Sequence, residues 1–184
     1  MTIRFAVAGD STTARPSAWP NFLTDPYLSR SGGLATSGAN SSQILASIAP
    51  APTADVLVVM LGTNDISDRL TRAKTKENIS AIVEKVGAPR VLLAAIAPSD
   101  ITSFGSPAID RQVLGFSLNR DLSQHAADNG WLFADPWAAV RVRSGGWANG
   151  ADEDGVHPTV ETSELYTGPR MSVYIRQAFE GATA

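Results

Sequence analysis

The sequence predicts an α/β fold in which a parallel sheet is covered by helices on both faces. Short apolar segments alternate with amphipathic segments along the chain, which is the order expected of strand–helix–strand units. The clearest strand, residues 55–61, reads DVLVVML and is apolar at nearly every position, as is typical of a strand buried on both sides. Hydrophobic residues make up 43% and charged residues 18% of the chain, so it has enough apolar surface to fold around a core.

The spacing of apolar residues and the positions of proline and glycine define the remaining elements. Pro16 and Pro20 forbid a long helix after the first strand, and the pair Gly32-Gly33 predicts a turn. The pair Gly168-Pro169 should interrupt the last helix and restart it near Arg170. Spacings of three and four between apolar residues predict the long helices. We expect strands at residues 3–8, 34–36, 55–61, 90–97 and 131–134, and helices at 41–48 (capped by Asn40 or Ser41), 74–86, 110–129, 136–143 and 161–179.

Length and composition exclude several classes of protein. A chain of 184 residues without an internal repeat or linker predicts a single domain over residues 1–184. With no cysteine, disulfides, thiolate nucleophiles and thiolate metal sites are excluded. The net charge of -3 argues against binding to nucleic acid or to an anionic membrane, which both need a basic face.

The apolar runs bear on the cellular location. All of them are far shorter than the roughly 20 residues of a transmembrane helix, and the N-terminus lacks the pattern of an export signal. We therefore expect a cytoplasmic protein, or a secreted one whose signal is not part of this chain. The sequence predicts no particular oligomeric state.

Polar residues gather where the predicted strands end. Ser11 follows the first strand, Gly38 the second and Asn64 the third, while Asp154 and His157 precede the last helix. Because ligands bind beyond the carboxyl ends of parallel strands, we expect these residues at one edge of the sheet. A hydroxyl, a flexible backbone amide, a carboxamide and an Asp/His pair are the parts that acyl transfer through a serine requires.

The choice of base is narrow because the chain has only 2 histidines, His125 and His157. His125 falls inside a predicted helix, where a structural role is the ordinary interpretation. His157 has Asp154 three residues before it, and one helical turn would bring the two side chains together. The carboxylate can then hold one imidazole nitrogen and leave the other free for Ser11.

Four blocks resemble those of the SGNH hydrolases, also called the GDSL esterases and lipases. They are GDS at 9–11, the glycine of SGAN at 38, GTND at 62–65 and DGVHP at 154–158. Their order and spacing are similar to that family over nearly the whole chain, and residues 119–137 are similar to its late helix and strand. One departure is GDSTT, which lacks the Leu that often follows GDS; we expect it to affect packing and not chemistry.

The resemblance implies a three-layer α/β/α sandwich with a flavodoxin-like parallel sheet, and ester hydrolysis without a metal or cofactor. It implies that Ser11 is the nucleophile, His157 the base and Asp154 the residue that orients it. The amides of Ser11 and Gly38 and the side chain of Asn64 would stabilise the oxyanion. Asp10 and Asp65 are expected to remain structural, by bonding backbone amides at the strand ends.

Other interpretations of the same residues lead to different functions. The loop GDSTT could hold the phosphate of a flavin, as in flavodoxin-like carriers, but this leaves His157 and Asn64 without a role. Asp152, Glu153, Asp154 and His157 could form a metal site with further ligands. A catalytically silent carbohydrate-binding homologue is the third alternative.

The substrate is the least determined feature. A short-chain ester, including O-acetyl groups on carbohydrate, is the first hypothesis, and a thioesterase or lysophospholipase of the same family is the alternative. Phe104 and Trp147, in loops beside the expected site, are candidate substrate-binding residues, and Trp19 is a weaker one. Three arginines, Arg111, Arg141 and Arg143, could contact an anionic substrate, although a solvated face is the simpler interpretation.

Overall fold

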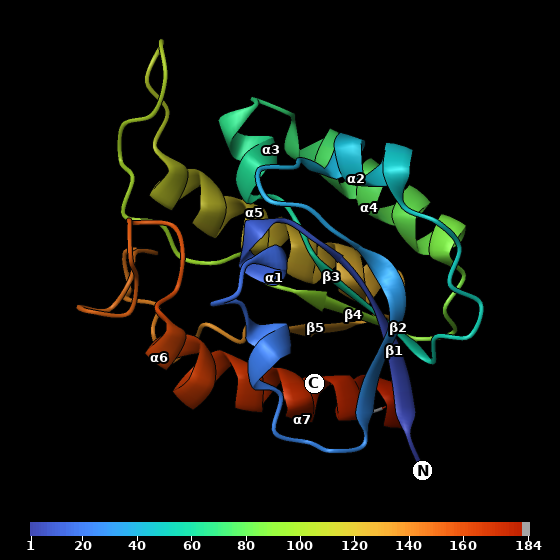
Figure 1. Ribbon diagram of the computed structural model, residues 1–184. Coiled ribbons are helices and arrows are strands. Elements are labelled where there is room, and N and C mark those ends of the chain that lie inside the picture. The colour runs from blue at the N-terminus through green and yellow to red at the C-terminus, as the bar shows by residue number, and fades with distance from the viewer. Residues whose placement is uncertain (182–184) are drawn as a thin grey trace.

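The computed structural model describes residues 1–181 and is built around a five-stranded sheet whose strands are all parallel (Figure 1). The strand order is β2-β1-β3-β4-β5, which is the flavodoxin-like order. The strands are β1 (Ile3–Gly9), β2 (Leu28–Ala35), β3 (Val56–Met60), β4 (Val91–Ala94) and β5 (Leu132–Ala134).

Helices cover both faces of this sheet. In Figure 1, α2 (Ser41–Ser47), α4 (Arg72–Val86) and α5 (Arg111–Asp128) lie on one face, and α7 (Gly168–Glu180) lies on the other. The predicted three-layer α/β/α sandwich is thus confirmed. The shorter elements are α1 (Ser11–Ala14), the 3-10 helix η1 (Trp19–Phe22), α3 (Thr63–Ser67), α6 (Val160–Thr162) and the π-helical turn η2 (Ser163–Thr167).

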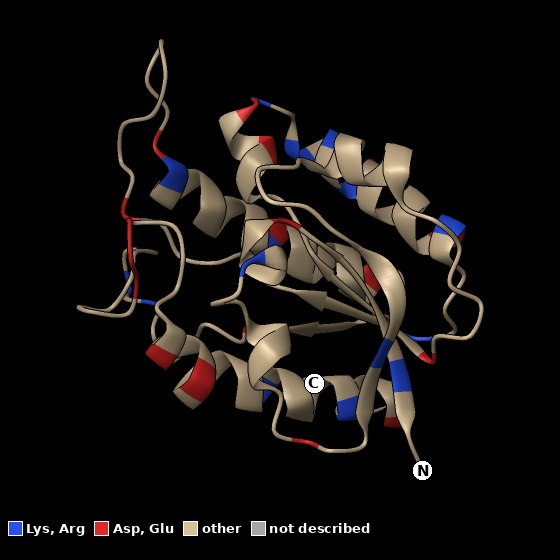
Figure 2. Ribbon diagram, viewed as in Figure 1, with Lys and Arg blue, Asp and Glu red and all other residues tan. Residues whose placement is uncertain are grey.

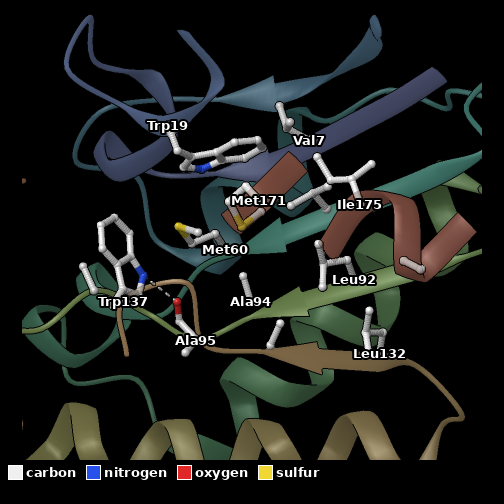
Figure 3. Packing of buried hydrophobic residues seen from close by; sticks show 14 of the residues in the cluster. Val7, Trp19, Met60, Leu92, Ala94, Ala95, Leu132, Trp137, Met171 and Ile175 are labelled. Atoms are coloured by element: carbon white, nitrogen blue, oxygen red, sulfur yellow. Dashed lines mark hydrogen bonds between the residues drawn. The ribbon is translucent and has the colours of Figure 1, made fainter. Parts of the chain in front are cut away.

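Each face of the sheet has its own apolar core. On the α7 face, Trp19, Met171 and Ile175 pack against the strands (Figure 3), and all three side chains are fully buried. The indole of Trp137 donates a hydrogen bond to the Ala95 carbonyl at 3.0 Å, so its polar edge is satisfied inside this core. The opposite core joins α2, α4 and α5 to the sheet through Ile44, Ile79, Ile82, Leu118 and Leu122.

The second strand is longer than predicted, and the expected turn at Gly32-Gly33 is wrong. Both glycines lie inside β2, which pairs with β1 over its whole length with one register shift. Gly33 has φ +86°, and a Cβ there would lie 2.0 Å from the Val7 carbonyl oxygen. The glycine therefore permits a close approach of two strands rather than a reversal of the chain.

The predicted helix at residues 136–143 is also wrong, because these residues form turns. Their backbone groups pair with a neighbouring loop: the Ala148 amide donates to Val140 and the Val142 amide to Gly146. With its amides and carbonyls bonded in this way, the segment cannot form a regular helical ladder.

The ends of two other elements differ from the prediction for local reasons. The fourth strand stops at Ala94, since the Ile96 amide and carbonyl bond to the side chain of Asn119. The last helix restarts at Gly168, two residues before the predicted Arg170, where the turn η2 leads into α7 with Pro169 in its first turn. A Cβ at Gly168 would lie 2.2 Å from the Phe22 carbonyl oxygen, so glycine lets the helix pack closely here.

The surface carries charges of both signs. Lys and Arg are interspersed with Asp and Glu over the helices and loops (Figure 2). Within residues 1–181, every helix is too short or too polar to span a bilayer.

Replacing Gly33 should test the strand contact. We expect Gly33→Ala to lower the free energy of unfolding by at least about 3 kcal/mol, because the new methyl group overlaps the backbone of Val7 in addition to straining φ. Gly87→Ala is the matched control: it has φ +75° and open space around the Cβ, so only about 1 kcal/mol should be lost. Urea denaturation measures both, and equal losses would contradict the close approach.

Candidate active site

Ser11 lies at the first position of the one-turn helix α1, directly beyond the end of β1. Asp10 caps this helix: its Oδ1 accepts hydrogen bonds from the Thr12 amide at 2.9 Å and the Thr12 hydroxyl at 2.8 Å. Asp10 is 1% exposed, and burial raises its pKa above the ordinary value against the effect of these two bonds. The cap fixes the backbone on which the Ser11 hydroxyl is presented.

The side chains of Ser11, His157 and Asp154 form one line of contacts. His157 Nε2 lies 2.8 Å from Ser11 Oγ, although 146 positions separate the two residues. His157 Nδ1 lies 2.8 Å from Asp154 Oδ2. A carboxylate can only accept, so Nδ1 carries the proton and Nε2 offers its lone pair to the Ser11 hydroxyl.

Asp154 is held in its ionised form. Although partial desolvation acts in the opposite direction, the ring and backbone N–H groups of His157 donate to the carboxylate and lower its pKa below the ordinary value. Arg15, just past the end of α1, lies 3.7 Å from Asp154 Oδ2. A negative charge beside Nδ1 favours an imidazolium at His157, which is the state the ring reaches when it takes a proton.

The turn that carries Asp154 and His157 is anchored by its own backbone. The Gly155 amide donates to the Asp152 carboxylate, and the Glu153 amide donates to the His157 carbonyl at 2.8 Å. The Asp152 carboxylate thus bonds to the Gly155 amide, and the Asp154 carboxylate bonds to His157. In the part of the chain that the structure describes, no group of three or more His, Asp or Glu side chains could hold a metal ion, so the metal-site interpretation has no geometric basis there.

Three strand ends meet at Gly9, the last residue of β1. Gly9 pairs with Ala35 of β2 and with Met60 of β3, so the loops that follow all three strands begin side by side. Gly38 and Asn64 lie three and four residues beyond those partners. The topology thus brings them to the edge where Ser11 lies.

Several N–H groups are free at this edge. Among residues 1–181, no hydrogen bond is formed by the amides of Ser11 or Gly38. Gly38 has φ +78° and open space where a Cβ would be. One N–H of the Asn64 carboxamide donates to the Ala39 carbonyl at 3.0 Å, which orients the side chain and leaves its second N–H available.

A buried carboxylate ties the Asn64 loop to its surroundings. Asp65 is 1% exposed and accepts hydrogen bonds from the Ser41 amide at 2.9 Å, the Ser41 hydroxyl and the Thr75 hydroxyl at 3.0 Å. Asp65 and Asp10 thus bond backbone amides beyond the strand ends, as predicted. The contacts of Asp65 join α2, α3 and α4 behind Asn64.

Comparison with known proteins identifies the family. The sequence profile of the GDSL-like lipase/acylhydrolase family matches residues 7–165. The chain belongs to this family. None of the curated proteins matches the sequence. Because the match spans the segments that carry Ser11, Gly38, Asn64, Asp154 and His157, the resemblance inferred from the four blocks is confirmed, and this GDSL-like protein is a carboxylic ester hydrolase.

Solved structures share the fold at low sequence identity. A GDSL-like lipase from Bacteroides thetaiotaomicron is 24% identical, with a TM-score of 0.73 over 96% of this chain and 87% of that one. A carbohydrate acetylesterase family member from Sinorhizobium meliloti is 18% identical, with a TM-score of 0.69 over 97% and 100%. A carbohydrate esterase family 3 structure from Talaromyces cellulolyticus is 19% identical, with a TM-score of 0.69 over 99% and 100%.

The aromatic side chains predicted to contact substrate are placed differently from one another. Phe104 is 39% exposed in the loop after β4. Trp147 is only 5% exposed and packs edge-on against Trp137 in the core, with ring centroids 5.5 Å apart. Trp19 is fully buried. The prediction for Trp19 is therefore wrong, and the structure argues against Trp147 because burial leaves almost none of its ring for a ligand.

Two contacts near the site of this hydrolase carry no signal in the sequence. Arg15 approaches Asp154, and the Asp100 amide donates to the Gly155 carbonyl at 2.9 Å, which links the loop after β4 to the His157 turn. Both residues lie outside the four family blocks. The second histidine, His125 of α5, lies 2.9 Å from Ser80 Oγ of α4 and takes no part in the site.

The two buried carboxylates should respond differently to neutralisation. Asp10→Asn is expected to raise the free energy of unfolding at pH 7. Because the pKa of Asp10 is raised in the native state, its stabilising effect is fully present below the ordinary Asp pKa and is lost as the pH rises through the raised value. The gain in Asp10→Asn should therefore shrink as the pH is lowered towards 3.8.

Asp65→Asn is the matched control. Its new NH₂ group would face hydroxyl and amide donors, so we expect a loss of about 1–3 kcal/mol. Urea denaturation at a series of pH values from about 4 to about 8 measures both variants. A loss of stability in Asp10→Asn at pH 7 would contradict the cost of the buried charge.

Proposed function

We propose that this GDSL-like hydrolase is a serine esterase that cleaves short-chain carboxylic esters, including O-acetyl groups on carbohydrate, through an acyl-enzyme on Ser11. One observation carries the proposal: two contacts of 2.8 Å connect Asp154 to His157 and His157 to Ser11. This is the arrangement in which a base can remove the proton of a serine while a carboxylate holds the base in orientation.

In the first half of the reaction, Ser11 Oγ attacks the carbonyl carbon of the ester as His157 Nε2 takes its proton. The carbonyl oxygen becomes an oxyanion, which accepts hydrogen bonds from the amides of Ser11 and Gly38 and from the free N–H of Asn64. The tetrahedral intermediate then expels the alcohol, which takes the proton from His157. The acyl group remains on Ser11.

In the second half, water takes the place of the alcohol. His157 removes a proton from water, and the oxygen attacks the acyl carbon with the same three donors on the oxyanion. When this intermediate collapses, Ser11 Oγ leaves and recovers its proton from His157, so the enzyme is regenerated and a carboxylic acid is released. The negative charge of Asp154 favours the imidazolium in both halves.

The choice of substrate rests on the structural neighbours. Two of them bear the names of carbohydrate esterases, and a third is a GDSL-like lipase. Acetyl groups on sugars are small enough to be held mainly by the oxyanion donors, with the sugar outside the reacting centre. The open space around Gly38 allows the acyl carbonyl to approach the backbone closely.

Removal of the nucleophile is the direct test. Ser11→Ala should lower kcat/KM for 4-nitrophenyl acetate by at least about 10³-fold, because no attacking oxygen remains. A fluorophosphonate should label the wild type at Ser11, as read by mass spectrometry of the tryptic peptides. Ser117→Ala, at a half-buried serine of α5, is the control and should keep full activity and labelling. Full activity in Ser11→Ala, with an adduct elsewhere, would overturn the proposal.

Asn64 tests the stabilisation of the oxyanion. Loss of one such donor typically costs about 10²–10³ in kcat, and we expect this loss in Asn64→Ala with KM nearly unchanged. The hydrogen bond to the Ala39 carbonyl is lost as well, so the free energy of unfolding, measured by thermal denaturation, should decrease by about 1 kcal/mol. Asn129→Ala at the end of α5 controls for removal of an exposed carboxamide. A normal kcat in Asn64→Ala would exclude the assigned role.

A further inference from the structure

Arg111 is a buried cation without a carboxylate partner in the described part of the chain. It is the first residue of α5 and is 7% exposed. Its Nε is inaccessible to solvent and makes no hydrogen bond, and within residues 1–181 no carboxylate lies within 4.0 Å of the guanidinium. Arg141 shows the contrast: its guanidinium pairs with Asp135 at 3.1 Å and donates to the Ile96 carbonyl at 2.6 Å.

This placement is unfavourable for stability. Removing a charge from water without a counterion is costly. The N-terminus of a helix carries a partial positive charge, which repels a cation. The carboxylate of Asp110 caps α5 by accepting the Val113 amide at 3.0 Å, and it forms no ion pair with Arg111 among residues 1–181. The interaction with the Phe104 ring, whose centroid is 5.4 Å from Arg111 Cζ, offsets only part of this cost.

The start of α5 lies beside the active site. Arg111 donates its backbone N–H to the Ile101 carbonyl at 3.0 Å, and the adjacent Asp100 amide donates to Gly155, two residues before His157. The start of α5, the loop after β4 and the His157 turn therefore lie side by side. Burial lowers the pKa of Arg111, while the charges of Asp10 and Asp154 oppose this shift. The site's carboxylates are thus near enough to act on the guanidinium without pairing with it.

The accessible part of Arg111 is its tip. Nε is buried, whereas the two terminal nitrogens are not among the buried unpaired atoms and form no hydrogen bond within residues 1–181. Arg111 Cζ lies over the Phe104 ring, 5.4 Å from its centroid. The terminal N–H groups are therefore available to a ligand, and their fork matches the two oxygens of a carboxylate.

We propose that Arg111 is a specificity residue that binds an anionic group, a carboxylate in the first instance, on the alcohol portion of the ester. The inference rests on the proposed esterase function. The alcohol is assigned because His157 gives its proton to the leaving oxygen, and the loop that holds Arg111 contacts the His157 turn. The favoured substrates are then acetyl esters of acidic alcohols, such as O-acetylated sugar acids.

A matched pair of esters tests the contact. 4-Acetoxybenzoate and methyl 4-acetoxybenzoate share the acetyl group and the aromatic leaving group, and differ in a carboxylate. In the wild type, kcat/KM should be higher for the carboxylate. In Arg111→Gln the ratio of the two values should fall by about ten- to hundredfold, as expected for loss of a charged hydrogen bond. Arg120→Gln, in the same helix with a 75% exposed side chain, should leave the ratio unchanged.

The inference is overturned if Arg111→Gln has the melting temperature of the wild type and the ratio of the two kcat/KM values is unchanged. If this variant does not fold, Arg111→Lys keeps the charge but loses the two-pronged edge, and the ratio should still fall by at least about threefold. An Arg111-dependent preference for a carboxylate on the acyl portion, tested with the 4-nitrophenyl monoester of adipate, would overturn the assignment to the alcohol.

Failure of the esterase proposal has a different signature. Neither ester would then be hydrolysed by the wild type, whatever residue 111 is. Calorimetric titration of Ser11→Ala with 4-acetoxybenzoate reads the Arg111 contact without turnover. Binding tighter than that of the methyl ester, and lost in the double variant with Arg111→Gln, supports the contact; equal binding of the two esters overturns it.

Discussion

The position of the nucleophile and of the oxyanion donors depends on the parallel pairing of three strands at Gly9. In a parallel sheet all carboxyl ends lie at one edge, and the order β2-β1-β3 makes the strand that leads to Ser11 the neighbour of the two that lead to Gly38 and Asn64. The donors and the nucleophile therefore rest on backbone that is fixed by the ladder. Gly33, which allows β2 to approach β1 closely, belongs to the same arrangement.

Buried carboxylates continue this order beyond the ends of the strands. Asp10 and Asp65 are both 1% exposed, yet within residues 1–181 neither pairs with a cation. Asp10 accepts from the amide and hydroxyl of Thr12 in α1, and Asp65 accepts from Ser41 of α2 and Thr75 of α4. Loop backbone beyond a sheet has unpaired N–H groups that must find acceptors. Asp10 satisfies them at α1, and Asp65 does so at the start of α2. Burying two carboxylates costs free energy, but their hydrogen bonds fix the segments that carry Ser11 and Asn64.

The sequence predicts the reacting side chains of this site better than the residues that surround them. Strand β3 could be predicted because its apolar run is a local signal. The contact of His157 with Asp154 could be predicted because the two residues are only three positions apart. The whole of β2 could not, since the polar segment from Leu28 to Gly33 forms a strand only through its pairing with β1. Burial of Trp147 and Arg111 is likewise a tertiary property: it depends on how Trp147 packs against Trp137 and Arg111 against Phe104, and no sequence pattern predicts either contact.

The site therefore consists of two halves with different supports. Ser11, Gly38 and Asn64 follow on strands of the sheet. Asp154 and His157 instead lie on a turn that one backbone hydrogen bond, from the Asp100 amide to the Gly155 carbonyl, connects to the loop after β4. The same loop packs on Arg111 through Ile101. An anion on the substrate that neutralises Arg111 would remove the cost of its unpaired charge, and would do so next to the segment that holds the base. Substrate selection and the alignment of His157 with Ser11 then depend on one loop.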